Sequence, residues 1–115
     1  MGPLIHFGVA QKREYVELER YARRENIEVE DVVLNLGNSN PVYESGFPLH
    51  SILTKLNQLE SRWDFRESQD AGSFVCNALY YFSLRDNVER LFIHVPMMDK
   101  GEAIALGSLI GNFFA

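Results

Sequence analysis

The second half of this sequence alternates between helical and strand patterns, and that alternation restricts the folds open to it. Leucine and isoleucine recur at three- and four-residue spacing from Leu49 to Leu59, which predicts a helix with one apolar face. The alternation continues with a short strand at 63–67, a helix after Ser73, a buried strand at Arg90–Val95 and a last helix at Gly101–Phe114. This order favours a parallel sheet with crossover helices.

The first half of the chain adds further strand patterns. Leu4–Val9 is a short apolar run, and residues 15–22 alternate between apolar and acidic side chains, as in a strand with one polar face. Residues 32–36 predict another short strand, and Gly37–Pro41 predicts a turn. On the helix after Ser73, we expect Val75, Leu79 and Phe82 to share the buried face. The expected class is α/β or α+β.

Composition limits the domain count and the partners. A chain of 115 residues, 46% of them hydrophobic, fits a single domain over 1–115. It has 11 Lys+Arg against 16 Asp+Glu, so the formal net charge is −5, and this argues against nucleic acid as a partner. No apolar run approaches the roughly 20 residues that span a bilayer, and no secretion signal precedes the first strand. With a single cysteine as well, we expect a cytoplasmic protein without a membrane partner.

Metal and cofactor sites are not expected. The three histidines lie far apart, at positions 6, 50 and 94, and the lone cysteine offers no paired thiolates, so no zinc-type spacing exists. Neither the P-loop nor the dinucleotide-binding fingerprint occurs in the chain.

Cys76 has two interpretations. A lone cysteine is by default a small buried apolar residue. If Ser73 caps the following helix, however, Cys76 lies in the first helical turn, directly after the loop that follows a strand. Free backbone N–H groups and the helix dipole would stabilise a thiolate there and lower the pKa of the thiol. Cys76 is therefore a candidate nucleophile.

His94 is the candidate base, although a buried histidine in a strand is also a common core residue. A right-handed crossover would return its strand beside the strand that precedes Cys76, so that both side chains emerge at the same edge of the sheet. A thiol and an imidazole within hydrogen-bond reach form an activated nucleophile with its base. A carboxylate should orient the imidazole, and spacing alone does not choose between Glu17 and Glu19.

Three segments resemble motifs of the pyroglutamyl-peptidase I (pyrrolidone-carboxylate peptidase) family. Residues 70–77 (Asp-Ala-Gly-Ser-Phe-Val-Cys-Asn), followed by Tyr80 and Tyr81, resemble its nucleophile motif, and residues 92–96 (Phe-Ile-His-Val-Pro) resemble its histidine motif. Residues 5–10 (Ile-His-Phe-Gly-Val-Ala), then Arg13 and residues 16–22 (Val-Glu-Leu-Glu-Arg-Tyr-Ala), resemble its glutamate motif. In that motif the acidic residue directly before the basic one is catalytic, which selects Glu19.

The resemblance implies a fold and an activity. The fold is three-layer α/β/α with a mostly parallel twisted sheet. The activity is that of a cytosolic cysteine-type exopeptidase that removes N-terminal pyroglutamate (5-oxoproline) from peptides through an acyl-enzyme. The resemblance assigns Cys76 as nucleophile, His94 as base and Glu19 as the residue that orients the imidazole. It places Phe74, Val75 and Arg13 at substrate-binding positions.

The sequence also departs from the family pattern. Family members carry an N-terminal strand and a Phe/Gly-rich loop ahead of the glutamate motif, and no segment here matches them. We therefore expect a sheet short of at least one strand, whose exposed edge favours self-association of the chain. The expected partners are pyroglutamyl peptides and further copies of the chain. The alternative function is that of an inactive or truncated relative acting as a binding module.

Overall fold

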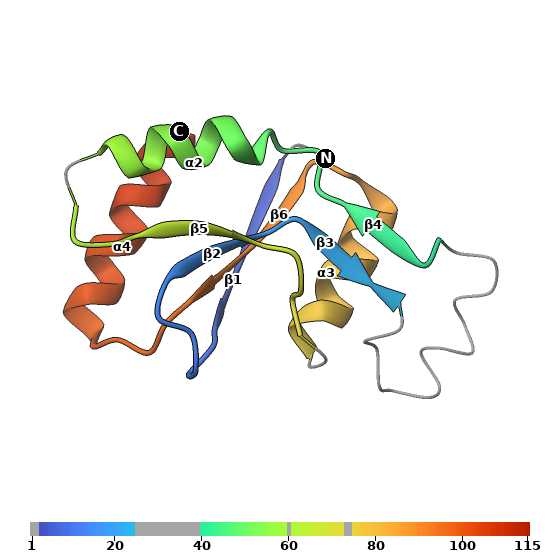
Figure 1. The fold of residues 1–115 in the computed structure, drawn as a ribbon, viewed down its shortest axis with the longest axis horizontal. Helices are drawn as coiled ribbons and strands as arrows, with labels where there is room; N and C mark the ends of the chain where they lie inside the picture. The colour runs from blue at the N-terminus through green and yellow to red at the C-terminus, as the bar shows by residue number, and fades with distance from the viewer. Residues whose placement is uncertain (1–2, 25–39, 60, 73–74) are drawn as a thin grey trace.

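The computed structural model describes residues 3–24, 40–59, 61–72 and 75–115. These residues form a four-stranded sheet, a two-stranded sheet and three α-helices (Figure 1). In chain order the elements are β1 (Leu4–Val9), β2 (Val16–Glu19), β3 (Tyr21–Arg23), β4 (Val42–Glu44), α2 (Leu49–Gln58), β5 (Phe65–Ser68), α3 (Val75–Asp86), β6 (Arg90–Val95) and α4 (Lys100–Phe114). The strand predicted at 32–36 and the first three residues of the turn predicted at 37–41 lie outside the described residues.

The larger sheet has the strand order β1-β6-β2-β5. Two of its three strand pairs, β1 with β6 and β2 with β5, are parallel, whereas β2 runs antiparallel to β6. The expected α/β class with a mostly parallel sheet is confirmed. The expected direct crossover from β5 to a neighbouring β6 is wrong, because β2 from the first half of the chain lies between them.

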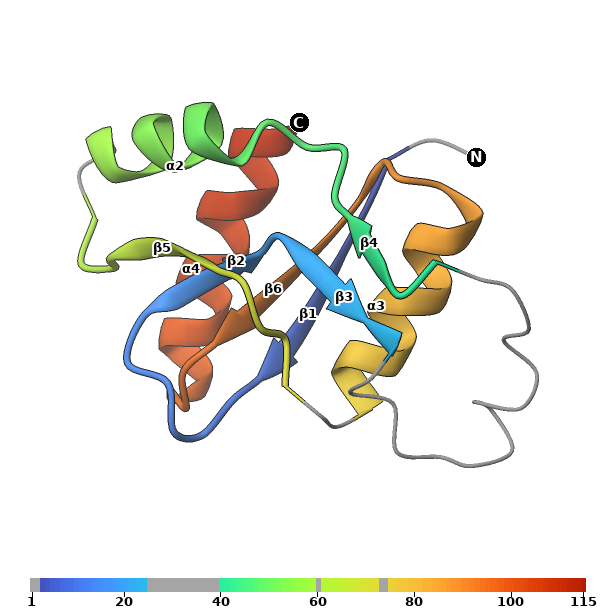
Figure 2. The same ribbon diagram turned by 45° about the vertical axis from the view of Figure 1, so that its right-hand side comes forward.

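Helices cover the larger sheet on both faces (Figures 1 and 2). On one face, α2 and α4 pack on apolar side chains that include Leu18 from β2 and Ile93 from β6. On the other face, α3 packs on Phe92 of β6 and on Ala22 of β3. Because successive strand side chains point to opposite faces, β6 contributes to both cores. These are the three layers that the resemblance implies.

The inner face of α3 differs from the predicted one. Leu79 is 49% exposed, and the buried positions are Asn77, Tyr80, Tyr81 and Leu84, which recur at helical spacing. Asn77 is held by two hydrogen bonds to the backbone of Arg23 in β3, where its Oδ1 accepts from the N–H at 3.0 Å and its Nδ2 donates to the carbonyl at 2.8 Å. Three of the four buried residues of α3 carry polar atoms, so a search for apolar residues at helical spacing does not find this face.

The other elements lie close to their predicted positions. Helix α2 buries Leu49, Ile52 and Leu56 as its spacing predicts. Helix α4 begins one residue before the predicted Gly101, and the side chain of Asp99 caps it by accepting from the Glu102 N–H at 2.8 Å. The strand predicted at 63–67 lies at Phe65–Ser68. Among the described residues, no helix is long and apolar enough to cross a membrane.

Strand β1 forms an exposed apolar edge of the sheet. It pairs with β6 on one side, and no described strand pairs with its other side. Phe7 is 51% exposed and Val9 is 61% exposed, and Phe7 also borders an apolar pocket of about 190 Å³ against Leu106 and Gly107 of α4. An edge strand with unpaired backbone and exposed apolar side chains is a surface on which chains pair.

We expect the chain to self-associate through β1, and Phe7→Lys to shift it toward the monomer, because a charged side chain on an edge strand opposes pairing. Sedimentation at several protein concentrations measures the shift, with circular dichroism to show that the variant is folded. Leu59→Lys is the matched control, since Leu59 is similarly exposed (43%) but lies after α2. A wild-type chain that stays monomeric at all concentrations would contradict this expectation.

Candidate active site

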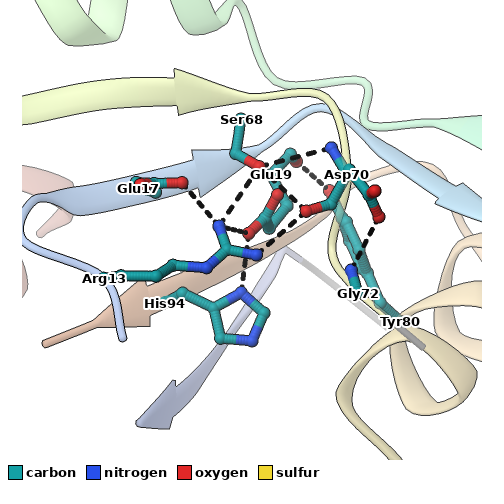
Figure 3. A network of polar contacts seen from close by, with 8 residues as sticks. All are labelled: Arg13, Glu17, Glu19, Ser68, Asp70, Gly72, Tyr80 and His94. Atoms are coloured by element: carbon teal, nitrogen blue, oxygen red, sulfur yellow. Dashed lines mark hydrogen bonds and ion pairs between the residues drawn. The ribbon is translucent and has the colours of Figure 1, made fainter. Parts of the chain in front are cut away.

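The candidate active site is built on a contact between β2 and β6. Oε2 of Glu19 lies 2.6 Å from Nδ1 of His94, and both side chains are almost wholly buried (Figure 3). Because a carboxylate only accepts hydrogen bonds, Nδ1 carries the proton. In the neutral ring, Nε2 is then the basic nitrogen, and it has no hydrogen-bond partner among the described residues.

The ladder between β2 and β6 shows which glutamate meets the imidazole. Glu17 lies directly opposite His94, and Glu19 lies two residues further along β2. Both glutamates point to the face that α3 covers, since the residues between and before them belong to the core under α2 and α4. Glu19 reaches His94 on the diagonal, which long side chains can span, whereas Glu17 binds Arg13.

Arg13 joins these glutamates to the loop before α3 (Figure 3). Its Nη1 lies 2.5 Å from Oε2 of Glu17 and 2.7 Å from Oε2 of Glu19, and it donates to Oγ of Ser68 at 3.2 Å. Its Nη2 donates to the carbonyl oxygen of Asp70 at 2.9 Å. The guanidinium thus places one positive charge between two neighbouring carboxylates and reduces their mutual repulsion.

Helix α3 holds the Glu19–His94 pair from above the sheet. The hydroxyl of Tyr80 in α3 donates to the carbonyl oxygen of Glu19 at 2.7 Å. The ring of Phe92, which lies in β6 beneath α3, packs against His94 at 4.8 Å between centroids. Tyr80 is fully buried, and burial raises the pKa of its hydroxyl far above the ordinary value. The hydroxyl therefore stays protonated, and so a donor, at neutral pH.

Cys76, the second residue of α3, lies above the strand residue that pairs with His94. Gly8 of β1 is opposite His94 in the parallel ladder. A Cβ atom placed on Gly8 would lie only 3.1 Å from Sγ of Cys76, so the sulfur sits directly over this glycine. Because neighbouring strands are about 4.8 Å apart, the thiol and the imidazole are neighbours on the same face of the sheet.

The structure brings Cys76 and His94 together by a different route from the predicted one. The prediction placed both at the carboxyl ends of two adjacent parallel strands, but β5 and β6 are not adjacent and run in opposite directions. Instead, the chain leaves β5, and α3 begins over β1. Strands β2 and β6 therefore lie between β5 and the strand over which α3 begins.

A pocket of about 470 Å³ opens beside these groups. It is lined by Cys76 and His94, by residues 9–13 after β1, and by Ala71 and Gly72 before α3. No acidic side chain lines it among the described residues. No hydrogen bond joins Sγ of Cys76 to the imidazole in the described part of the chain, so the thiol is not engaged by the base in this state.

The environment of Cys76 shifts its pKa in the direction opposite to the prediction. Burial raises the pKa of the thiol, and the charge of Glu19 adds to this rise. The backbone N–H of Cys76 and the charge of Arg13 act to lower it, but they do not outweigh burial. The predicted helix-stabilised thiolate is therefore wrong, and the thiol is protonated at neutral pH.

The remaining predicted residues fall in three places. Arg13 borders the pocket, Val75 is the first residue of α3, and Phe74 lies outside the described residues, as does the predicted cap Ser73. The sequence did not indicate Ser68, whose hydroxyl accepts from Arg13 and donates to the Asp70 carbonyl. Its only signal is that it ends a strand beside Glu19. The described residues contain no group of histidine, cysteine and acidic side chains that could hold a metal ion.

Comparison with solved structures identifies the fold. The chain superimposes on pyrrolidone carboxyl peptidase from Thermus thermophilus with a TM-score of 0.68 and 27% identity, over 90% of this chain and 57% of that one. The fold is that of the pyrrolidone carboxyl peptidases. The enzyme from Pyrococcus furiosus gives a TM-score of 0.67 at 26% identity, over 90% and 56% of the two chains. Pyroglutamyl peptidase I from Bacillus amyloliquefaciens gives a TM-score of 0.65 at 24% identity, over 82% of this chain and 52% of that one, and shows a similarity of fold alone.

This chain thus spans little more than half the length of the pyrrolidone carboxyl peptidases that it resembles. No model of a known protein family and no curated protein sequence matches it. The expected resemblance to pyrrolidone carboxyl peptidases is confirmed at the level of structure, and it extends over almost the whole of the present chain.

Gly8→Ala should lower the free energy of unfolding by about 1–3 kcal/mol, the usual cost of overpacking. The added Cβ would lie 2.9 Å from two ring carbons of Phe92 and 3.1 Å from Sγ of Cys76. Urea denaturation measures the change. Gly107→Ala is the control, because its Cβ would meet nothing within 4 Å on helix α4, so it should raise stability by about 0.5–1 kcal/mol. Equal stability of wild type and Gly8→Ala would refute the close approach.

The raised pKa of the Cys76 thiol predicts slow alkylation at neutral pH. Since only the thiolate reacts, the rate with a small thiol reagent should keep rising through the alkaline range and reach its half-maximum above the pH found for the urea-unfolded chain. Stopped-flow or mass-spectrometric rates at fixed reagent concentration give both profiles. A plateau already reached below pH 7 would show a thiolate and contradict the burial effect.

Proposed function

We propose that this chain hydrolyses the bond after an N-terminal pyroglutamyl residue, with Cys76, His94 and Glu19 as its triad. The observation that carries the proposal is the buried contact of 2.6 Å between Nδ1 of His94 and Oε2 of Glu19, which leaves Nε2 as a base in a pocket shared with Cys76. The fold of the pyrrolidone carboxyl peptidases and the three sequence motifs support the substrate class.

The arrangement supports a two-step acyl transfer. Nε2 of His94 takes the proton from the Cys76 thiol as Sγ attacks the scissile carbonyl carbon. Backbone N–H groups in the first turn of α3 are donors for the oxyanion that forms. His94 then returns the proton to the leaving amine, and the C–N bond breaks to give a thioester. Water, deprotonated by the same imidazole, hydrolyses this thioester and restores the thiol.

Glu19 has an electrostatic role in these steps. When His94 takes up the proton, the imidazolium faces a carboxylate at hydrogen-bond distance, which stabilises the charged intermediate and fixes the ring in the productive tautomer. A base is needed here because burial raises the pKa of the Cys76 thiol. The proton therefore moves from the Cys76 thiol to His94 during the reaction, and not in the resting state.

The pocket favours a substrate with an uncharged N-terminus. A free amino terminus carries a positive charge and calls for an acidic partner, but none of the described residues that line the pocket is acidic. A pyroglutamyl end is a neutral lactam. It needs shape and hydrogen bonds, which the small residues Ala10, Ala71 and Gly72 and the exposed backbone of this pocket can provide.

A fluorogenic pyroglutamyl amide tests the proposal. Wild type should release the fluorophore, Cys76→Ala and His94→Ala should fall to background, and Glu19→Gln should lose about 10²–10⁴-fold in kcat, as when a triad carboxylate becomes an amide. His50→Ala is the matched control, because His50 lies exposed on α2. The corresponding alanyl amide should not be cleaved. Equal rates for wild type and Cys76→Ala would end the proposal.

The second candidate is a binding module without activity, and the exposed apolar edge of β1 is the observation that favours it. The chain covers only part of the length of the pyrrolidone carboxyl peptidases, so groups that complete their sites need not all be present. Absence of turnover together with strong self-association that Phe7→Lys abolishes would favour this second function.

A further inference from the structure

The guanidinium of Arg13 occupies a junction between three parts of the site. It follows β1 in the chain and contacts Glu17 and Glu19 of β2, Ser68 at the end of β5 and the carbonyl of Asp70 in the loop before α3 (Figure 3). Arg13 borders the pocket, yet these four contacts are all with the protein itself. Its side chain is 21% exposed, so most of it is out of solvent.

The first effect of this junction is on charge. Glu19 is fully buried, and its Oε1 has no hydrogen-bond partner among the described residues. A buried carboxylate stays ionised only beside a compensating charge. Arg13 supplies that charge at Oε2, the same oxygen that accepts from Nδ1 of His94. The imidazole of His94 thus shares its carboxylate oxygen with a permanent cation.

The other titratable groups around His94 do not take over this role. They are Glu17 from β2, Cys76 and Tyr80 from α3, and His6 from β1, which stacks on Phe92. Lys12 lines the same pocket as His94 but forms no ion pair with Glu19 in the described part of the chain. Tyr80 and Cys76 are neutral because burial raises the pKa of each. Burial and the charge of Arg90 lower the pKa of His6, so it too is neutral near pH 7. Of the described residues in contact with Glu19, Arg13 is the permanently charged cation.

The second effect is on the position of the nucleophile. The bond from Nη2 of Arg13 fixes the carbonyl of Asp70, whose own Oδ1 accepts from the Gly72 N–H at 2.8 Å. Gly72 has φ of +88°, a left-handed conformation that favours glycine. In the chain, this segment precedes α3, the helix that carries Cys76. One guanidinium therefore contacts both the carboxylate behind the base and the Asp70–Gly72 segment that borders the pocket.

We propose that Arg13 is a positioning residue that holds the Glu19–His94 pair and the Asp70–Gly72 loop in register, so that Nε2 of His94 faces Cys76. The expected change in kcat rests on the proposed function, whereas the expected change in the environment of His94 does not. It replaces the expectation that Arg13 binds substrate. The two roles differ in what the loss of the side chain changes: a substrate-binding residue raises KM, and a positioning residue lowers kcat.

Arg13→Met and Arg13→Lys test the proposal with the fluorogenic pyroglutamyl amide. In Arg13→Met, kcat should fall about 100-fold, as for a misplaced catalytic group, with KM within about threefold of wild type. The acidic limb of the kcat/KM profile should move to higher pH, because Glu19 alone then favours the imidazolium. In Arg13→Lys, the acidic limb of the kcat/KM profile should return to its wild-type pH, because the positive charge is kept. Only part of kcat should return, since a single ammonium cannot reproduce the forked contacts of the guanidinium.

Arg20→Met is the matched control. The guanidinium of Arg20 also bridges two carboxylates, Glu44 at 3.0 Å and Glu67 at 2.6 Å, but it forms no ion pair with the side chain of Glu19 or His94 among the described contacts. It should lower stability without moving the pH profile. A raised KM with unchanged kcat in Arg13→Met, or the same pH profile in Arg13→Met and wild type, would overturn the proposal.

A readout without turnover separates this inference from the proposed function. Ring-proton NMR of His94 across pH, in wild type and in Arg13→Met, reports directly when the imidazole takes up its proton. A shift to higher pH in the variant supports the role of Arg13 even if the wild type cleaves no pyroglutamyl amide, in which case the proposed function alone fails. Coincident titrations in the two proteins overturn the positioning role even if the wild type is active.

Discussion

The buried carboxylate of Glu19 is the constraint on which the site depends. An ionised group with no exposed surface must have its charge balanced inside the protein, and here Arg13 and the Nδ1–H of His94 meet on a single oxygen. Each of these partners lies on a different part of the chain, so the ionic cluster can form only when the β1–β2 turn, β2 and β6 are all in place. Removing one partner would leave an uncompensated buried charge, which is far more costly than losing a surface ion pair.

Strand β2 is the element through which this constraint reaches the rest of the fold. It lies between β5 and β6, with one face in the apolar core under α2 and α4 and its glutamates on the other. Because β2 runs antiparallel to β6, Glu19 stands near the middle of β6, where Tyr80 and Phe92 shield it. Glu19 is therefore buried in the sheet, and Cys76 and His94 line the pocket.

Local sequence pattern predicted the elements well and their arrangement less well. The apolar runs of β1 and β6 and the spacing of α2 are properties of neighbouring residues, so they could be read directly. The insertion of β2 between β5 and β6 is a pairing of segments distant in the sequence, which hydrophobic periodicity along the chain cannot indicate. The buried face of α3 was misplaced because the spacing of Val75, Leu79 and Phe82 takes no account of Asn77 and the two tyrosines, whose polar atoms are satisfied inside. The thiol was expected to be acidic because the helix dipole could be inferred from sequence, whereas its burial could not.

Gly8 gives the site a property that no side chain could give it. The surface beneath the sulfur of Cys76 is bare backbone, belonging to the strand that pairs residue for residue with the strand of His94. The distance of the Cys76 sulfur from the sheet is thus set by the backbone of Gly8, which, unlike a side chain, cannot change rotamer. A side chain at this position would act as a spacer under Cys76, lifting its sulfur away from His94 while every residue of the proposed triad remains in the sequence.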